Sequence, residues 1–333
     1  LRRASGKPLG RGDKTIQPWI GYSPASVDLQ RKIAHLRGER GPILIEGPSG
    51  SGKEVVAGLL HFQEGDESSS TKQQPRPLVS INVAAIPENL FESELFGHTK
   101  GAFTGAENHK MGLIEAASGG DLFLDEIEAL SEKHQAKLLR FLENGELRRV
   151  GAKETIATNV RVIAATNRNL EEMVKKGEFR EDLLWRLAGK KIKVPPLTDR
   201  RDDIPLLAKF FGDLEKPRRN KTWTEDALVA LQKHDWPGNV RELKRICEQL
   251  CLISPLPIIR ADDVAQVLQP TISSQRSKNI DFGLGLSRLI ADFESEIIRT
   301  SLDRHRDIDA TANVLGISRS SLYKKIKDHR IEL

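Results

Sequence analysis

The sequence predicts an α/β fold with a parallel sheet, followed by an all-helical region and a small helix-turn-helix unit near the C-terminal end. Three observations support this prediction. An apolar run at 42–45 leads into a glycine-rich loop and a helix with a periodic apolar face. A second apolar run, at 122–124, is typical of a fully buried parallel strand. After residue 197 strand signals cease, and helical periodicity is found at 204–212, 226–234, 240–252 and 262–268.

The glycine-rich loop fits the strand, loop and helix pattern that cradles phosphates. Its backbone amides and the helix start would face the phosphates, and Lys53 would place its charge by the β and γ phosphates. A purely structural glycine loop is the alternative. Glu54 stands where the general pattern has Ser or Thr to bind Mg²⁺, so another carboxylate is needed. The candidate nucleotide-binding residues are Gly47, Pro48, Ser49, Gly50, Ser51, Gly52, Lys53 and Glu54.

A short stretch of small residues lies between the glycine loop and the second strand: Gly101, Ala102, Phe103, Thr104, Gly105 and Ala106. It carries no group suited to phosphate chemistry. Two glycines, two alanines and one bare phenyl ring suit an exposed loop that offers Phe103 to a partner. The alternative is a buried glycine turn.

Two carboxylates follow the strand at 122–124. Because parallel strands deliver their last residues to one edge of the sheet, Asp125 is placed to hold Mg²⁺ and Glu126 to polarise an attacking water. The alternative is a solvated helix start. The order of lysine loop and acid pair in one α/β segment favours ATP hydrolysis with Mg²⁺.

Several motifs now carry a resemblance: 92–98 leading into 101–106, then 122–126, 179–187 and 236–243. The chain resembles the bacterial enhancer-binding proteins, the AAA+ activators of sigma-54 RNA polymerase, from about residue 21 to 330. The resemblance implies an AAA+ P-loop NTPase with an α-helical lid. It also implies that the loop at 101–106 contacts sigma-54.

The resemblance assigns further catalytic candidates. Asn167, after the strand at 160–165, would be the first sensor of the γ phosphate, and Asn82 would restrain Glu126. Arg180 and Arg186 would be trans-acting arginine fingers, although six positions on a helix separate them by about 120°. A surface salt bridge is the alternative for either arginine.

The helix at 240–252 begins after Trp236-Pro237-Gly238-Asn239. Asn239 is predicted to cap it, with Glu242 completing a capping box. Arg241 then projects from the first turn, and the resemblance makes it the second sensor. Cys247 and Cys251 share the apolar stripe of this helix and are predicted to be buried packing residues.

The C-terminal segment predicts helices at 294–305, 310–315 and 319–330 around a turn at 316–318. Its expected core is Ala312, Leu315, Ile317, Leu322 and Ile326. From residue 310 onward five Lys or Arg face two acids, a net of 5 − 2 = +3, which suits phosphate contact. A dimerisation hairpin is the alternative. The resemblance implies a Fis-type DNA-binding domain, with candidate contacts Arg319, Ser320, Ser321, Tyr323 and Lys324.

Length and composition agree with a multidomain chain: 333 residues, 38% hydrophobic and a net charge of +5. No apolar run reaches membrane-spanning length, so no membrane partner and a cytoplasmic location are expected. The predicted parts are a tail at 1–20 whose regulatory domain is absent or removed, a nucleotide-binding subdomain at 21–197, a lid at 198–269, a linker at 270–285 and the helix-turn-helix at 286–333. The polar stretch at 64–77 is predicted to be an exposed loop.

The interpretation is an ATP-dependent transcriptional activator that binds enhancer DNA and remodels the sigma-54 RNA polymerase holoenzyme from a closed to an open complex. The expected assembly is a homo-oligomer, a dimer on DNA and a hexameric ring in action. Two alternatives remain: a DNA-binding regulator whose ATPase domain only switches assembly, and a remodelling enzyme for another protein.

Overall fold

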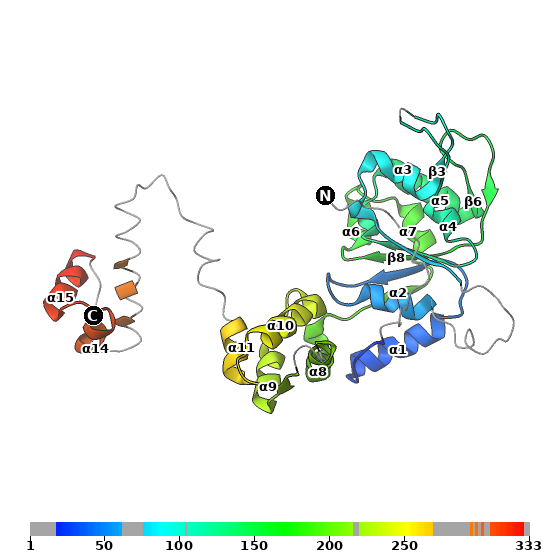
Figure 1. The fold of residues 1–333 in the computed structure, drawn as a ribbon. Helices are drawn as coiled ribbons and strands as arrows, with labels where there is room; N and C mark the ends of the chain where they lie inside the picture. The colour runs from blue at the N-terminus through cyan, green and yellow to red at the C-terminus, as the bar shows by residue number, and fades with distance from the viewer. Residues whose placement is uncertain are drawn as a thin grey trace. The chain divides into compact units, whose positions relative to one another are not determined.

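A computed structural model describes residues 18–61, 76–103, 105–215, 220–268, 294–295, 297–298, 301–302 and 307–329. The chain divides into two compact units, Leu1–Leu268 and Gln269–Leu333 (Figure 1). Thr104, residues 1–17, most of the polar stretch at 64–77 and the predicted linker at 270–285 lie outside the described residues.

The larger unit is built on a parallel sheet with the strand order β2-β5-β8-β1-β9. The strands are β1 (Ile43–Glu46), β2 (Leu78–Asn82), β5 (Asp121–Asp125), β8 (Arg161–Thr166) and β9 (Lys191–Lys193). Central strands β1, β5 and β8 are almost wholly buried because helices cover both faces, which is why they read as continuous apolar runs. The α/β prediction is confirmed.

Alternate strand residues enter the two cores on either side of the sheet. On one face Phe123 and Ile163 pack with helices α1 (Pro24–Leu36) and α2 (Lys53–His61). On the other, Leu122 and Val162 pack in a core that includes residues of α3 (Glu88–Phe96), α4 (Leu113–Ala116), α5 (Glu132–Asn144), α6 (Leu170–Lys175) and α7 (Glu181–Leu187) (Figure 1). The sheet therefore presents its polar chemistry at its edges, where the strands end.

Short elements connect the strands and helices of this core, as turns directly after β2 and β5 and as hairpins that precede β5 and β8. The turns η1 (Val83–Ala85) and η2 (Ile127–Ala129) directly follow β2 and β5. Two small hairpins, β3 (Gly97–His98) with β4 (Lys110–Met111) and β6 (Glu146–Leu147) with β7 (Ile156–Ala157), lie side by side, since His98 bridges to Val150. The 101–106 loop connects β3 to β4.

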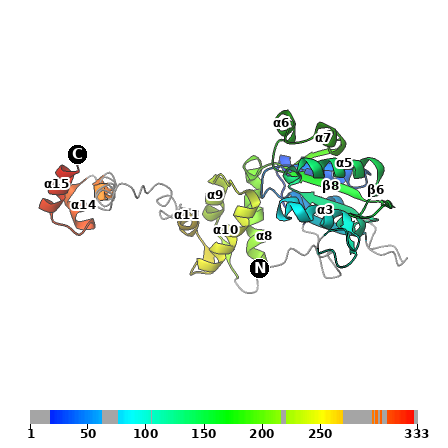
Figure 2. The same cartoon turned by 90° about the horizontal axis from the view of Figure 1, so that it is seen from above.

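The helices after residue 197 form a separate part of the larger unit, beside the sheet and its covering helices (Figure 2). They are η3 (Leu197–Asp203), α8 (Ile204–Leu214), α9 (Glu225–Lys233), α10 (Asn239–Ile253) and α11 (Ala261–Leu268). Cys247 and Cys251 are buried in their shared core, as predicted. The expectation of helices alone was wrong, because β10 (Thr222–Trp223) and β11 (Ile258–Ile259) pair as parallel strands. Two-residue strands are too short to leave a periodic signal.

The start of α1 is fastened to the start of the lid. The carboxylate of Asp203 is fully buried and accepts hydrogen bonds from the amides of Tyr22 and Ser23 at 2.7 and 2.8 Å. It also accepts from the hydroxyls of Ser23 and Ser26 at 2.8 and 2.5 Å. The segment entering α1 therefore lies against the hinge between sheet and lid.

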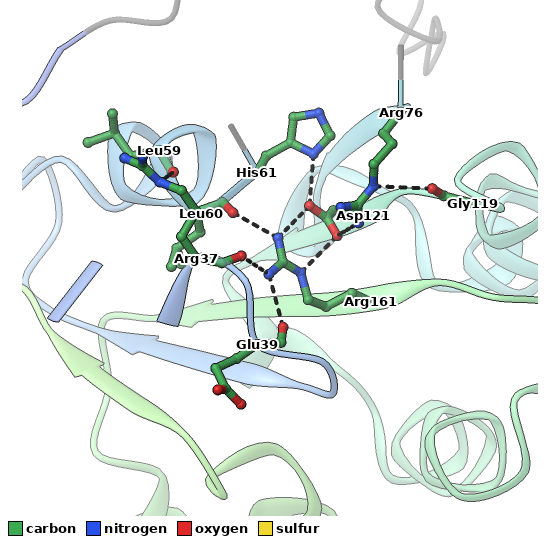
Figure 3. A network of polar contacts seen from close by, with 9 residues as sticks. All are labelled: Arg37, Glu39, Leu59, Leu60, His61, Arg76, Gly119, Asp121 and Arg161. Carbon is green, nitrogen blue, oxygen red and sulfur yellow. Dashed lines mark hydrogen bonds and ion pairs between the residues drawn. The ribbon is translucent and has the colours of Figure 1, made fainter. Parts of the chain in front are cut away.

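A buried polar network ties together the opposite edge of the sheet, where β5 and β8 begin (Figure 3). Asp121 accepts two hydrogen bonds from Arg161 and contacts His61 and Arg76. Arg161 also donates to backbone carbonyls at the ends of the two flanking helices, those of Arg37, Glu39 and Leu60. A polar cavity of about 370 Å³ beside this network is therefore remote from the glycine loop.

The smaller unit contains α14 (Ile308–Val314) and α15 (Arg319–Asp328). Gly316 has a φ of +63° in the turn, and the Ser318 hydroxyl caps α15 by accepting from the amide of Ser321. Ala312, Leu322 and Ile326 are buried, with Leu315 and Ile317 packed against them, so the predicted core is confirmed. Of the predicted first helix, the described residues 294–295, 297–298 and 301–302 are helical.

No helix within the described ranges is long and apolar enough to cross a membrane.

Candidate active site

The glycine loop leaves the last residue of β1 and runs into the first residue of α2, Lys53. Gly50 and Gly52 have φ values of +73° and +108°, which L side chains rarely adopt. At Gly50 a Cβ would also lie 2.3 Å from the carbonyl oxygen of Gly238. Glycine is therefore required there both by conformation and because the lid packs directly on the loop.

Lys53 turns back onto its own loop. The residue is 7% exposed, and Nζ donates to the carbonyls of Gly47 and Pro48 at 2.9 and 3.3 Å. Burial lowers the pKa of Lys53, while the carboxylates of Asp125 and Glu128 oppose that shift. The lysine charge thus lies close enough to the acids after β5 to interact with them. Glu54, by contrast, is exposed on α2.

The two predicted carboxylates stand at the end of β5. Burial raises the pKa of Asp125, and the attraction of Lys53 only partly offsets this. Glu126 adopts a left-handed backbone with φ 57° and ψ 49°, and its amide donates to Asp125 Oδ1 at 3.0 Å. A non-glycine residue held there costs about 1–3 kcal/mol, which the surrounding fold must impose.

The two asparagines lie at the ends of the strands that flank β5. Asn82 ends β2 directly beside Asp125 in register, and its Oδ1 accepts from the amide of Ala85 at 3.3 Å. Asn167 follows β8 and is exposed. Its backbone N–H donates to Glu128 Oε1 at 3.4 Å. The structure thus brings Asn82, Asp125 and Asn167 to one edge of the sheet, with Asn82 bonded to its own turn.

Glu128 is a residue that sequence reasoning missed. Its Oε2 is buried and has no hydrogen-bond partner among the described residues. The available signal was a third acid two positions after Glu126. Asp125 and Glu128 offer the carboxylate oxygens that Mg²⁺ prefers, and Mg²⁺ usually needs one or two carboxylates with phosphates and water. These residues therefore fit Mg²⁺ brought with a nucleotide, while no cluster of three metal-binding side chains occurs in the described part.

Arg241 reaches the glycine loop from the first turn of α10. Its Nη1 donates to Ser49 Oγ at 3.0 Å, and its amide donates to the carbonyl of Gly50 at 3.3 Å. The guanidinium is otherwise exposed. The lid thereby places a cation beside the predicted phosphate cradle.

The predicted capping box is only half right. Gly238 is the N-cap of α10, and Glu242 Oε2 accepts from its amide at 2.8 Å. Asn239 does not cap the helix. Its Oδ1 accepts from the amide of Leu197 at 2.8 Å, and its Nδ2 donates to the carbonyl of Ser49 at 3.0 Å. Asn239 has a φ of 52° and is 4% exposed. Its side chain is therefore buried in these long-range contacts and does not cap α10.

Arg200 and Trp19 form a second contact with the loop that the sequence did not suggest. Arg200 is 2% exposed, donates from Nη2 to the carbonyl of Ser51 at 2.7 Å, and stacks 4.2 Å from the Trp19 ring. Burial lowers the pKa of Arg200 to about 10, against the attraction of Asp203. An apolar pocket beside Gly52 is lined by these side chains together with Ile20, Val55, Leu207, Phe210, Phe211 and Val240.

The two candidate finger arginines stand at the two ends of one short helix, α7. Arg180 is the N-cap of α7 and forms an exposed ion pair with Asp182 at 2.7 Å. Arg186 lies in the last turn of α7 and donates to the carbonyl of Leu142 at 3.1 and 2.8 Å. Trp185, between them, is 71% exposed. The exposed part of α7 therefore carries an arginine at each end and an open tryptophan between them.

The 101–106 loop is exposed rather than a buried turn. Gly101, Phe103 and Gly105 are exposed, Ala102 is intermediate and Ala106 is buried. Phe103 is 42% exposed, and its ring lies edge-on to that of His98 with centroids 5.0 Å apart. The amide of Gly101 donates to the carbonyl of Ala106 at 2.8 Å, which closes the base of the loop.

On α15 the five candidate DNA contacts are all exposed, Arg319, Ser320, Ser321, Tyr323 and Lys324. Arg319 lies 3.1 Å from Asp309 and 5.9 Å from the Tyr323 ring centroid. The helix thus has a buried face, which packs the small core, and a polar face with basic groups.

Three protein families match successive parts of the chain. The Sigma-54 interaction domain matches residues 19–193, the AAA+ ATPase lid domain 198–280, and the Bacterial regulatory protein, Fis family, 289–329. Regulatory protein AtoC of Escherichia coli (strain K12) is 40% identical over 316 residues, which cover 93% of this chain and 67% of AtoC. NtrC of Azospirillum brasilense is 38% identical over 353 residues, 97% of this chain and 72% of NtrC.

Among solved structures, NtrX from Brucella abortus in complex with ATP matches with a TM-score of 0.68 and 33% identity over 94% of this chain and 69% of NtrX. These matches confirm the resemblance seen in the sequence. The chain therefore belongs to the sigma-54-dependent transcriptional activators, as an AAA+ ATPase with a sigma-54 interaction domain and a Fis-type helix-turn-helix for binding DNA.

Proposed function

We propose that this chain hydrolyses ATP between the protomers of a ring and uses the 101–106 loop to remodel sigma-54 polymerase from a closed to an open complex. The observation that carries the proposal is the exposed Phe103 in the loop between the paired strands β3 and β4. An aromatic ring that is 42% exposed suits a protein partner better than a role in its own core.

The residues at the strand ends supply the chemistry. Lys53 and the loop amides would hold the phosphates, and Asp125 would hold Mg²⁺ with Glu128 nearby. Mg²⁺, when bound, would neutralise the charge that develops on the phosphates. Glu126 would orient and polarise the water, and Asn167 would sense the γ phosphate. Asn82 would hold Glu126 inactive until the 101–106 loop is correctly placed.

The apolar pocket beside Gly52 would receive the base of the nucleotide. It adjoins the glycine loop, and its walls come from the segment before α1, from α2 and from the lid. Apolar walls with few polar groups are typical of sites for flat aromatic ligands. Because the lid supplies both this wall and Arg241, its position would depend on the bound nucleotide.

Ring assembly would complete the site. Arg180 and Arg186 are held at the two ends of α7 by Asp182 and by the carbonyl of Leu142, and among the described residues neither forms a hydrogen bond with its own glycine loop. A guanidinium that stabilises the transition state from a neighbouring subunit makes hydrolysis dependent on assembly. We assign a homo-oligomer, expected to be hexameric, on this basis.

The smaller unit would deliver the ring to enhancer DNA as a dimer, with Arg319 and Lys324 as leading contacts. The corresponding division of the chain is a tail at 1–20, a nucleotide-binding subdomain at 21–197, a lid at 198–269, a linker at 270–285 and the DNA-binding domain at 286–333.

The test is conversion of closed to open complexes by sigma-54 polymerase on enhancer-bearing DNA with ATP. Transcription with the major sigma factor is the control, and it should not respond. ATP hydrolysis and DNA binding without any open complex would reject sigma-54 remodelling in favour of a regulator whose ATPase switches assembly alone.

A further inference from the structure

Two carbonyls of the glycine loop accept hydrogen bonds from side chains of the lid and the hinge. The carbonyl of Ser49 accepts from Asn239 Nδ2 at 3.0 Å, and that of Ser51 accepts from Arg200 Nη2 at 2.7 Å. The donors lie 190 and 149 positions away in the sequence. The loop is thus shaped by residues outside the motif that defines it.

Each of these bonds orients a whole peptide unit. A trans peptide is planar, and its C=O and N–H point in opposite directions. Fixing the carbonyl of Ser49 therefore fixes the amide of Gly50, and fixing the carbonyl of Ser51 fixes the amide of Gly52. Both glycines have positive φ, where the backbone would otherwise have wide freedom. Backbone amides of this kind form anion-binding concavities.

The two donors are built into the interior. Asn239 and Arg200 are 4% and 2% exposed. Asn239 is held by Leu197 at its other end and keeps a strained φ of 52°. Arg200 is packed on Trp19, and its Nε has no partner in the described part of the chain. A guanidinium buried without a carboxylate hydrogen bond is costly, so its strong bond to Ser51 needs a reason beyond packing.

We propose that Arg200 and Asn239 are positioning residues that turn the peptide planes of the glycine loop so that the amides of Gly50 and Gly52 face the phosphates. The proposal rests on the nucleotide site assigned above and adds a consequence to it. Both donors belong to the hinge and lid, so displacement of the lid would release the loop and weaken phosphate binding.

The test measures binding of MgADP by calorimetry to the full chain and its variants. Arg200→Met removes the donor but keeps an apolar side chain against Trp19, and Arg200→Lys restores a cationic donor. Asn239→Gly removes the donor and tolerates the positive φ. Arg201→Met is the matched control, because Arg201 donates to the lid carbonyls of Gln232 and His234 instead.

We expect Kd for MgADP to rise at least about tenfold in Arg200→Met and in Asn239→Gly. This is the factor expected when one backbone amide no longer donates its hydrogen bond to a charged phosphate. Arg200→Lys should recover part of the loss, and Arg201→Met should bind normally. A merely structural role would reduce the fraction of binding-competent protein and leave Kd unchanged, so the stoichiometry separates the two.

Wild-type Kd at normal stoichiometry in both Arg200→Met and Asn239→Gly would overturn the proposal. If Arg200→Met does not fold, Asn239→Gly decides alone. Failure of the wild-type chain to bind MgADP would instead refute the nucleotide site itself, and the proposal with it.

Discussion

Asp121→Asn should strongly destabilise the larger unit, although Asp121 lies at the edge of the sheet opposite the glycine loop. The carboxylate is fully buried and lies 2.8 and 2.7 Å from Arg161 Nε and Nη2, 2.8 Å from His61 Nδ1 and 3.4 Å from Arg76 Nη2 (Figure 3). The amide of asparagine has the same shape but no charge. Its NH₂ group would face donors rather than acceptors.

The magnitude follows from what remains in the variant. Removing one partner of a buried ion pair costs about 3–5 kcal/mol. Arg161 keeps the carbonyls of Arg37, Glu39 and Leu60, so the lower end, about 3 kcal/mol, is expected. For a domain of this size that corresponds to a fall in Tm of about 6–12 °C.

Thermal unfolding of the full chain, followed by calorimetry, measures the effect. Asp235→Asn is the matched control, since Asp235 pairs with Arg201 at 2.8 Å but its side chain is 87% exposed. An exposed pair of this kind is worth about 0–1 kcal/mol. If Asp121→Asn shifts Tm no more than Asp235→Asn does, the network is not an anchor of the sheet and the reasoning is refuted.

The pH dependence gives an independent check. Burial alone would raise the pKa of Asp121, but hydrogen bonds from His61 and Arg161 outweigh it and hold the pKa below its usual value. A lowered folded pKa contributes stability above the unfolded pKa of about 3.9 and loses it as the pH falls through the folded value. The difference in stability between wild type and Asp121→Asn should therefore narrow below about pH 4.

The remaining predictions concern the site and its partners. Phe103→Ala should leave ATP turnover largely intact and abolish capture of sigma-54, and equal loss of both activities would contradict the separation of chemistry from grip. Glu126→Ala should bind MgATP but lose turnover by about 10²–10⁴, whereas Asp125→Ala should weaken Mg²⁺-dependent binding as well; identical behaviour in binding and turnover assays would reject these roles. Asp125→Asn should raise the Tm of the nucleotide-free protein. Its folded pKa is raised by burial, so ionisation at neutral pH costs stability that the amide does not; an unchanged or lower Tm in calorimetry would contradict this. Trp185 is 71% exposed between the two finger candidates, and we expect the ring interface to bury it. Trp185→Ala should then weaken ring assembly by about thirtyfold, and unchanged sedimentation would place the contact elsewhere.

The elements that carry the site could be predicted because their signals are local. The apolar run at 42–45 became β1, and the acids after 122–124 stand at the end of β5. The predicted lid helices agree with α8 to α11 within about two residues. Each of these signals depends on neighbours in the sequence, where periodicity and burial leave a regular trace.

The contacts that shape the site could not be predicted in the same way. Arg200 stands in the run Thr198 to Asp203, which is polar and typical of a solvated turn, yet it is buried by Trp19. Asn239 carries a local capping signal that competes with a partner 190 positions away. Nothing in the spacing of residues encodes which of two such alternatives has the lower free energy, because tertiary packing decides it.

A left-handed backbone is strained for any residue other than glycine, so a non-glycine residue in this conformation indicates that its side chain is needed at that position. Within the described ranges, the non-glycine residues with positive φ are Glu126, Trp236 and Asn239. Each is held by its surroundings: Glu126 by Asp125, Asn239 by the glycine loop, and Trp236 by burial and by its indole donating to the carbonyl of Leu231 at 2.8 Å. Where only the conformation matters, as at the C-cap of α5, the chain uses Gly145. The cost of about 1–3 kcal/mol per strained residue is therefore tolerated at the end of β5 and in the part of the lid beside the glycine loop.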